Sequence, residues 1–249
     1  MISVCEELVE VLVAKASSIA KLMCPQDNFE KVLHSLCQLL NIDNCRNYDT
    51  LMYVNTIFSV LGKIFEEECT FASKIYLDTG YWWIPRRFIR KVATRLRAVG
   101  IYSRELIHFA YKAFSALLRI GVVGYKPKTV FRKLTENIYI AAQPDIYNPD
   151  TDTYYEFKLY PVTSTCFARK QAEIFAWVLQ KSVTLVGIVI KSNGYVDIEK
   201  IVIESPGELK INTDDIKRVA QKELFCLQSM IPFHQYKGKI AVLIDYEEL

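Results

Sequence analysis

The sequence lacks the features that mark several common classes of protein. Its 9 glycines form no phosphate-binding glycine-rich loop, and there is no repeat or low-complexity tract. The longest apolar run is far shorter than the roughly 20 residues that cross a bilayer. The N-terminus carries acids where a secretory signal is basic, namely Glu6, Glu7 and Glu10. We therefore expect an intracellular protein without a membrane partner.

Cysteine pairs with CxxC spacing are also missing. The 7 cysteines are an odd number, which is typical of a cytoplasmic, reducing compartment rather than of a disulfide framework. Hydrophobic residues make up 51% of the chain, enough to bury a substantial core. This composition favours a globular enzyme.

The modest net charge of +3 conceals a concentrated basic segment. Residues 81–135 contain thirteen basic residues and one acid, as expected of a surface that contacts a phosphate backbone. Within 86–99 basic side chains recur every four residues, opposite an apolar stripe, which predicts a helix with one cationic face. The candidate nucleic-acid-binding residues are Arg86, Arg87, Arg90, Lys91 and Arg95. The alternative is a solvated surface.

The chain before residue 99 has a different character from the remainder. Apolar periodicity predicts helices over 8–23, 29–40 and 51–65. We therefore divide the chain into a helical, partly basic N-terminal region, 1–98, and a second domain, 99–249. The first region could dock a protein partner, or its helices could pack directly on the second domain.

Two acids in the second domain are predicted to share one site. The turn formers from Asn148 to Asp152 separate two β-rich runs, 137–147 and 153–160, which indicates a β-hairpin. A hairpin symmetric about its centre places Asp145 opposite Glu156, and opposed Cβ atoms lie roughly 4.5–5.5 Å apart. Such a carboxylate pair recruits a counter-charge, for which Mg²⁺ is well suited.

Lys158 belongs on the same face of the hairpin, because side chains alternate along a strand and Lys158 is two residues beyond Glu156. The alternative is a surface hairpin whose charged face is solvated. A predicted helix over 167–180 follows, and Gln171 in it could offer its amide to a phosphate or to water.

Periodicity and turn residues predict an alternating order of helices and strands around this hairpin. A helix over 103–120 precedes strands over 129–133, 137–147 and 153–160. The helix over 167–180 and a buried strand over 183–190 come next, and together these give the order αβββαβ. A strand over 195–204, a helix over 213–230 and a strand over 239–246 complete a mixed α/β fold.

The motifs Pro144-Asp145, Glu156-x-Lys158 and Gln171-x-x-x-Phe175 resemble the PD-(D/E)xK nuclease superfamily, most closely its RecB-like branch. Phe175 stands where that branch typically has tyrosine. The resemblance implies a restriction-endonuclease-like fold and a nuclease dependent on Mg²⁺ or Mn²⁺. It also implies that the metal ligands are Asp145, Glu156 and the backbone carbonyl of Phe157, and that Lys158 and Gln171 are catalytic.

An upstream histidine contributes to the metal site in RecB-like relatives, so His108 in the predicted helix 103–120 is a candidate ligand, with Glu105 as its substitute. Relatives with an iron–sulfur cluster carry several cysteines beyond the nuclease core, where this chain has only Cys226, so no cluster is expected.

We therefore expect a metal-dependent deoxyribonuclease, although the residues do not distinguish DNA from RNA. The alternative is a catalytically silent nucleic-acid-binding protein, or an assembly protein that needs a partner, with the same fold.

Overall fold

The structure, a computed structural model, describes residues 12–24, 37, 48–81, 85–163, 165–190 and 195–230. The predicted helix over 29–40, apart from Cys37, and the predicted strand over 239–246 lie outside these residues. None of the helices in the described part of the chain is both long and apolar enough to span a membrane.

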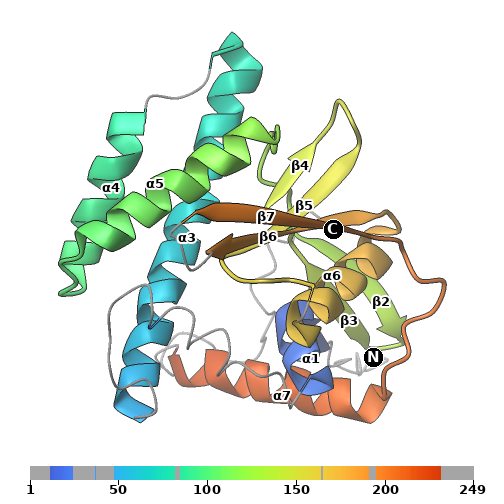
Figure 1. Cartoon of the computed structure of the whole chain (residues 1–249). Helices are drawn as coiled ribbons and strands as arrows, with labels where there is room; N and C mark the ends of the chain where they lie inside the picture. The colour runs from blue at the N-terminus through green and yellow to red at the C-terminus, as the bar shows by residue number, and fades with distance from the viewer. Residues whose placement is uncertain are drawn as a thin grey trace, which may run out of the picture.

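The described elements form a mixed α/β fold with two sheets, which confirms the predicted fold class (Figure 1). Its helices are α1 (Ala16–Met23), α3 (Tyr48–Thr79), α4 (Pro85–Ala98), α5 (Arg104–Arg119), α6 (Cys166–Leu179) and α7 (Thr213–Met230). Its strands are β1 (Leu12–Lys15), β2 (Val130–Thr135), β3 (Ile138–Ala142), β4 (Ile146–Asn148), β5 (Thr153–Lys158), β6 (Val183–Ile190) and β7 (Val196–Ile203).

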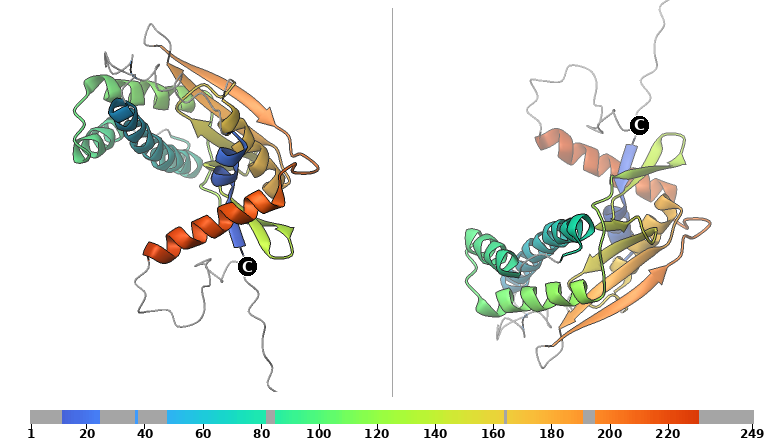
Figure 2. Two further views of the ribbon diagram at one scale, coloured as in Figure 1. Left: turned by 90° about the horizontal axis from the view of Figure 1, so that it is seen from below. Right: turned by 90° about the horizontal axis from the view of Figure 1, so that it is seen from above.

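The larger sheet has the order β4-β5-β6-β7. Strands β5 and β6 are parallel, and α6 connects them, because parallel neighbours require a long crossover. The apolar β6 is covered on both faces: Val186 and Ile188 belong to one buried cluster, while Val183 and Leu185 belong to another. Helices α3, α4 and α5 pack on the first face, whereas α6, α1 and α7 lie toward the second (Figure 2).

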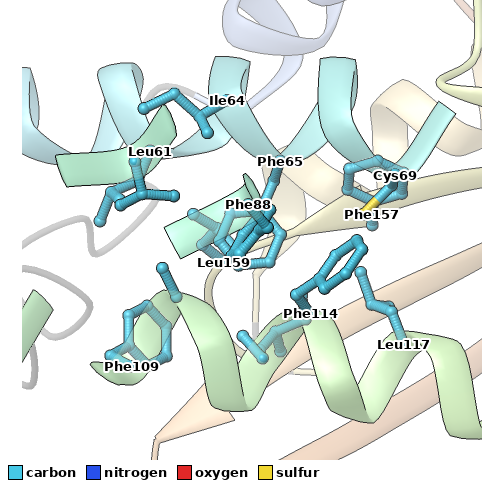
Figure 3. Close-up of a cluster of buried hydrophobic side chains, with 14 of the residues drawn as sticks. Leu61, Ile64, Phe65, Cys69, Phe88, Phe109, Phe114, Leu117, Phe157 and Leu159 are labelled. Carbon is cyan, nitrogen blue, oxygen red and sulfur yellow. The ribbon is translucent and has the colours of Figure 1, made fainter. Parts of the chain in front are cut away.

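Aromatic side chains fill the contact between α3, α4 and α5 (Figure 3). Phe88 of α4 stacks on Phe114 of α5 with ring centroids 4.3 Å apart, and it meets Phe65 of α3 edge-on at 5.7 Å. Phe157 of β5 belongs to the same cluster. Helices of the N-terminal region 1–98 and elements of the second domain therefore share one core. This is the second of the two alternatives, in which the N-terminal helices pack directly on the second domain.

Three of the predicted elements are wrong in detail. The helix predicted over 51–65 is much longer, because α3 begins at Tyr48 and ends at Thr79. In the predicted helix 8–23, residues 12–15 form β1, which pairs in parallel with β3, and residues 16–23 form α1. The predicted strand 137–147 is broken at Pro144, which cannot donate a ladder hydrogen bond. Its first part, β3, joins a small sheet of order β1-β3-β2, whereas β4 pairs with β5 in the larger sheet.

Candidate active site

The hairpin of β4 and β5 has the register that the sequence predicts. Ile146 pairs with Tyr155 and Asn148 pairs with Thr153, and continuing this register places Asp145 opposite Glu156. The backbone N–H of Asp145 donates to the carbonyl of Tyr155 at 3.1 Å. In the turn, the side-chain oxygen of Asn148 accepts a 2.9 Å hydrogen bond from a backbone N–H two residues later, the contact by which asparagine favours turns.

Asp145 and Glu156 lie at the end of this hairpin in a poorly hydrated setting. Glu156 is only 3% exposed, and Oδ2 of Asp145 accepts a 2.9 Å hydrogen bond from the backbone N–H of Phe157. Burial, followed by the like charge of Glu156, raises the pKa of Asp145 well above its ordinary value. The pair therefore holds more negative charge than its surroundings favour, which a cation would relieve.

Lys158 supplies one positive charge to this pair. Its Nζ lies 2.5 Å from Oε1 of Glu156, as the strand alternation predicts. Burial alone would lower the pKa of Lys158, but the attraction of Glu156, Tyr160 and Asp145 outweighs it, and the pKa is raised. Lys158 is therefore a cationic hydrogen-bond donor at neutral pH.

Gln171 reaches the same place from α6. Its side chain is only 7% exposed and lines a cavity of about 510 Å³ together with Asp145, Phe157 and Lys158. Two buried side-chain oxygens among the described residues lack a hydrogen-bond partner. They are Oε1 of Gln171 and Oε2 of Glu156. Buried acceptors are normally satisfied, so these two oxygens, close to the carboxylate of Asp145 with its raised pKa, are groups that a cation or a water would bind.

These residues fit Mg²⁺ or Mn²⁺, since both favour carboxylate and carbonyl oxygens and Mg²⁺ usually keeps several waters. Asp145 and Glu156 supply the carboxylates, and the backbone carbonyl of Phe157 is the third ligand that the family resemblance implies. Nowhere in the described part of the chain do three His, Cys, Asp or Glu side chains converge on one metal position. The ligand set is therefore sparse, as suits a strongly hydrated ion.

Neither upstream candidate lies at this site. His108 is exposed on α5, and it is not among the residues that line the cavity. Glu105 is also outside the cavity, and its Oε2 accepts a 2.9 Å hydrogen bond from the hydroxyl of Ser103, the N-cap residue of α5. The helix that faces the cavity is α3 instead of α5.

Glu66 of α3 is a cavity residue that the sequence did not single out. It is one of the charges that raise the pKa of Asp145, and it forms an ion pair with Lys126. The sequence offers no local signal for this contact, because 79 residues separate Glu66 from Asp145. The only hint is its position in a run of three acids directly after the predicted helix 51–65.

The cationic face predicted on α4 is partly neutralised. Lys91 forms an ion pair with the buried Glu68 of α3, and Nη2 of Arg95 lies 2.6 Å from Oε2 of Glu67. The guanidinium of Arg87 lies over the ring of Phe71, 5.3 Å from its centroid. Lys91, Arg95 and Arg87 thus attach α4 to α3, and Arg86 and Arg90 remain exposed on the outer face.

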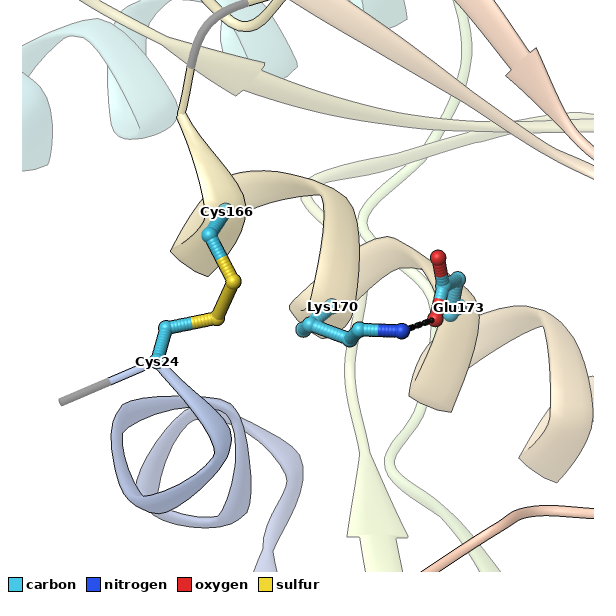
Figure 4. Close-up of a disulfide and its surroundings, with 4 residues drawn as sticks. All are labelled: Cys24, Cys166, Lys170 and Glu173. Carbon is cyan, nitrogen blue, oxygen red and sulfur yellow. Dashed lines mark hydrogen bonds and ion pairs between the residues drawn. A yellow bond between two sulfur atoms is a disulfide. The ribbon is translucent and has the colours of Figure 1, made fainter. Parts of the chain in front are cut away.

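A disulfide joins Cys24, just after α1, to Cys166 at the start of α6 (Figure 4). This pairing is at odds with the thiols expected from the cysteine count. It could not be anticipated, because the two residues are 142 positions apart and only the packing of α1 on α6 brings their Cα atoms to 5.9 Å. The bond anchors the helix that carries Gln171.

Comparisons with known proteins give one likeness. No protein-family model matches the sequence, and no curated protein matches it significantly. A solved structure from Eubacterium rectale, described as a putative exonuclease, is similar at a TM-score of 0.47 and 10% sequence identity, over 95% of this chain and 94% of that chain. The chemistry of the site is therefore inferred from its own geometry.

Proposed function

We propose that this protein is a metal-dependent nuclease that hydrolyses phosphodiester bonds, with DNA as the expected substrate. The observation that carries the proposal is the pair of the half-buried Asp145 and the buried Glu156, with Lys158 and Gln171 beside it and two acceptor oxygens unsatisfied. A merely structural ion pair would not need a second carboxylate, nor a cavity beside it.

Asp145, Glu156 and the carbonyl of Phe157 would hold Mg²⁺ or Mn²⁺. When bound, the ion supplies Lewis-acid chemistry, offsetting charge on the phosphate and providing a nucleophile at neutral pH. The backbone N–H of Phe157 fixes one oxygen of Asp145, so the other oxygen is oriented in advance.

Lys158 and Gln171 would act on the substrate side. Because the pKa of Lys158 is raised, its ammonium remains charged and can stabilise negative charge that develops on the phosphate oxygens. Gln171 reaches the cavity from a rigid helix, and its amide can orient a water or a phosphate oxygen. These are the roles that the family resemblance assigns to the same residues.

Cleavage of labelled linear, circular, single-stranded and branched DNA tests the proposal. The wild type is compared in Mg²⁺, Mn²⁺ and EDTA with Asp145→Asn and with Asp150→Asn, which removes an exposed carboxylate from the turn of the same hairpin. We expect metal-dependent cleavage by the wild type and Asp150→Asn, and none by Asp145→Asn. Absence of cleavage by folded wild type in every condition would instead favour the silent or partner-dependent protein.

A further inference from the structure

One face of α3 forms a polar wall of the cavity. The residues of this face recur at intervals of three and four, as neighbours on one side of a helix do. They are Asn55, Phe58, Ser59, Gly62, Lys63 and Glu66, and all of them line the cavity. Ser17 and Lys21 of α1 line it as well.

The charges in the cavity are unevenly compensated. Lys158 is paired with Glu156, and Glu66 is paired with Lys126. By contrast, Lys21 and Lys63 are exposed and lie within 4 Å of no carboxylate oxygen among the described residues, although Lys63 is one of the charges that lower the pKa of Glu67. A phosphodiester is an anion and is repelled by a carboxylate site, so these exposed lysines in the same cavity are the groups that would attract it.

Gly62 leaves room for a ligand beside these lysines. A Cβ built at Gly62 would meet no atom within 4 Å, although glycine inside a helix costs roughly 0.5–1 kcal/mol relative to alanine. The buried Oε1 of Gln171 lines the same cavity and lacks a partner, so it would accept a hydrogen bond from a donor such as water, while the amide N–H groups of Gln171 are the atoms that could donate to a phosphate. A volume of about 510 Å³ is that of a small-molecule site and suits about one nucleotide of a single strand, whereas a duplex is far too wide to enter.

We propose that Lys21 and Lys63 form a phosphate-binding subsite for a single nucleic-acid strand, which holds a phosphodiester next to the one at the carboxylates. This subsite rests on the proposed function, since it explains how an anionic strand is held beside Asp145. It also moves the main backbone contact from α4 to the wall formed by α1 and α3.

Binding in EDTA tests the subsite without cleavage. The probe is fluorescein-labelled pentathymidylate, titrated by fluorescence anisotropy at several NaCl concentrations. For single strands the slope of log K against log salt is about −0.7 per phosphate contact, so Lys21→Ala/Lys63→Ala should make the slope less negative by about 1.4. If the wild type and the double variant bind equally well near 1 M salt, where the electrostatic contribution vanishes, this change in slope makes the double variant bind roughly 25-fold more weakly at 0.1 M salt.

Two matched controls separate the subsite from general charge and folding effects. Lys74→Ala removes an exposed lysine from the same helix outside the cavity, and it should leave the slope unchanged. Gly62→Trp should block the space and weaken binding about as much as the double variant, whereas Gly62→Ala should bind like the wild type.

The outcomes distinguish this proposal from the nuclease proposal. A wild-type slope in Lys21→Ala/Lys63→Ala, or a wild type that does not bind the probe, would overturn the subsite whether or not the protein cleaves DNA. The expected slope change in a protein that cleaves nothing would support the subsite and leave the nuclease proposal refuted. Equal loss in Lys74→Ala would show that general charge, and not this wall, attracts the strand.

Discussion

Replacing Asp145 by asparagine should stabilise the metal-free protein while it removes activity. Asp145 and Glu156 face each other across the hairpin, and burial and this like charge raise the pKa of Asp145. Asparagine has the same shape, and its side-chain oxygen can still accept the hydrogen bond from the backbone N–H of Phe157. The substitution therefore removes repulsion and desolvation without removing the contact.

The size of the effect follows from the geometry. Two unit charges about 5 Å apart repel by about 3 kcal/mol at an effective dielectric constant near 20. Lys158, 2.5 Å from Glu156, offsets part of this repulsion. We expect Asp145→Asn to raise the free energy of unfolding by about 1–2 kcal/mol, equivalent to a rise in Tm of roughly 2–8 °C for a chain of this size.

The stabilisation should depend on pH in a defined direction. Below the ordinary carboxyl pKa both the folded and the unfolded wild type hold the proton, so the substitution changes little. As pH rises toward the elevated pKa of the folded state, the unfolded chain releases a proton that the folded state retains, and the wild type loses stability. The Tm difference between Asp145→Asn and wild type should therefore be smallest near pH 4 and grow toward neutral pH.

Thermal unfolding in EDTA and in Mg²⁺ provides the assay, with Asp150→Asn as the exposed control. Mg²⁺ at 100 times its Kd should stabilise the wild type by about 2.7 kcal/mol, and it should stabilise Asp145→Asn much less. A lower Tm for Asp145→Asn than for wild type in EDTA at neutral pH would refute the reasoning that this carboxylate pair is unfavourable without a cation.

Two further variants and the reduction of one disulfide test the packing of the fold. Lys91→Ala should lower the free energy of unfolding by about 3–5 kcal/mol in urea denaturation, because it leaves the buried Glu68 without its counter-ion. Gly187→Ala should cost about 1–3 kcal/mol by the same measurement, because its Cβ would lie 2.9 Å from a backbone carbonyl of the neighbouring segment. Reducing the Cys24–Cys166 disulfide should cost about 2–5 kcal/mol, because it closes a loop of 142 residues.

Each of these variants has a matched comparison. Arg90→Ala removes an exposed basic residue from α4 and should change stability by no more than about 0.5 kcal/mol, so an equal loss in both variants would contradict the Lys91 ion pair. Gly62→Ala should stabilise α3, and destabilisation there would contradict the open space at Gly62. Dithiothreitol should lower the stability of a double serine variant of Cys24 and Cys166 by less than it lowers that of the wild type, because only the disulfide of Cys37 is then left to reduce among the described cysteines.

Local patterns in the sequence determined the helices and strands around the site. The turn formers that follow Asn148 set a hairpin register in which Asp145 faces Glu156, because a turn fixes the pairing of the strands it connects. The alternation of side chains along β5 then placed Lys158 beside Glu156, and the apolar run 183–190 predicted a buried strand. All of these depend on interactions between residues close in sequence.

Contacts between distant segments were decided only by the tertiary structure. The cavity wall on α3, the pairing of β1 with β3 and the disulfide all join segments more than 70 residues apart, and no local periodicity encodes them. The ion pair between Lys91 and Glu68 is of the same kind: the sequence shows a basic helix face, but not the acids of α3 against which it packs. Charge patterning identifies a surface, whereas packing determines which of its charges remain available to a ligand.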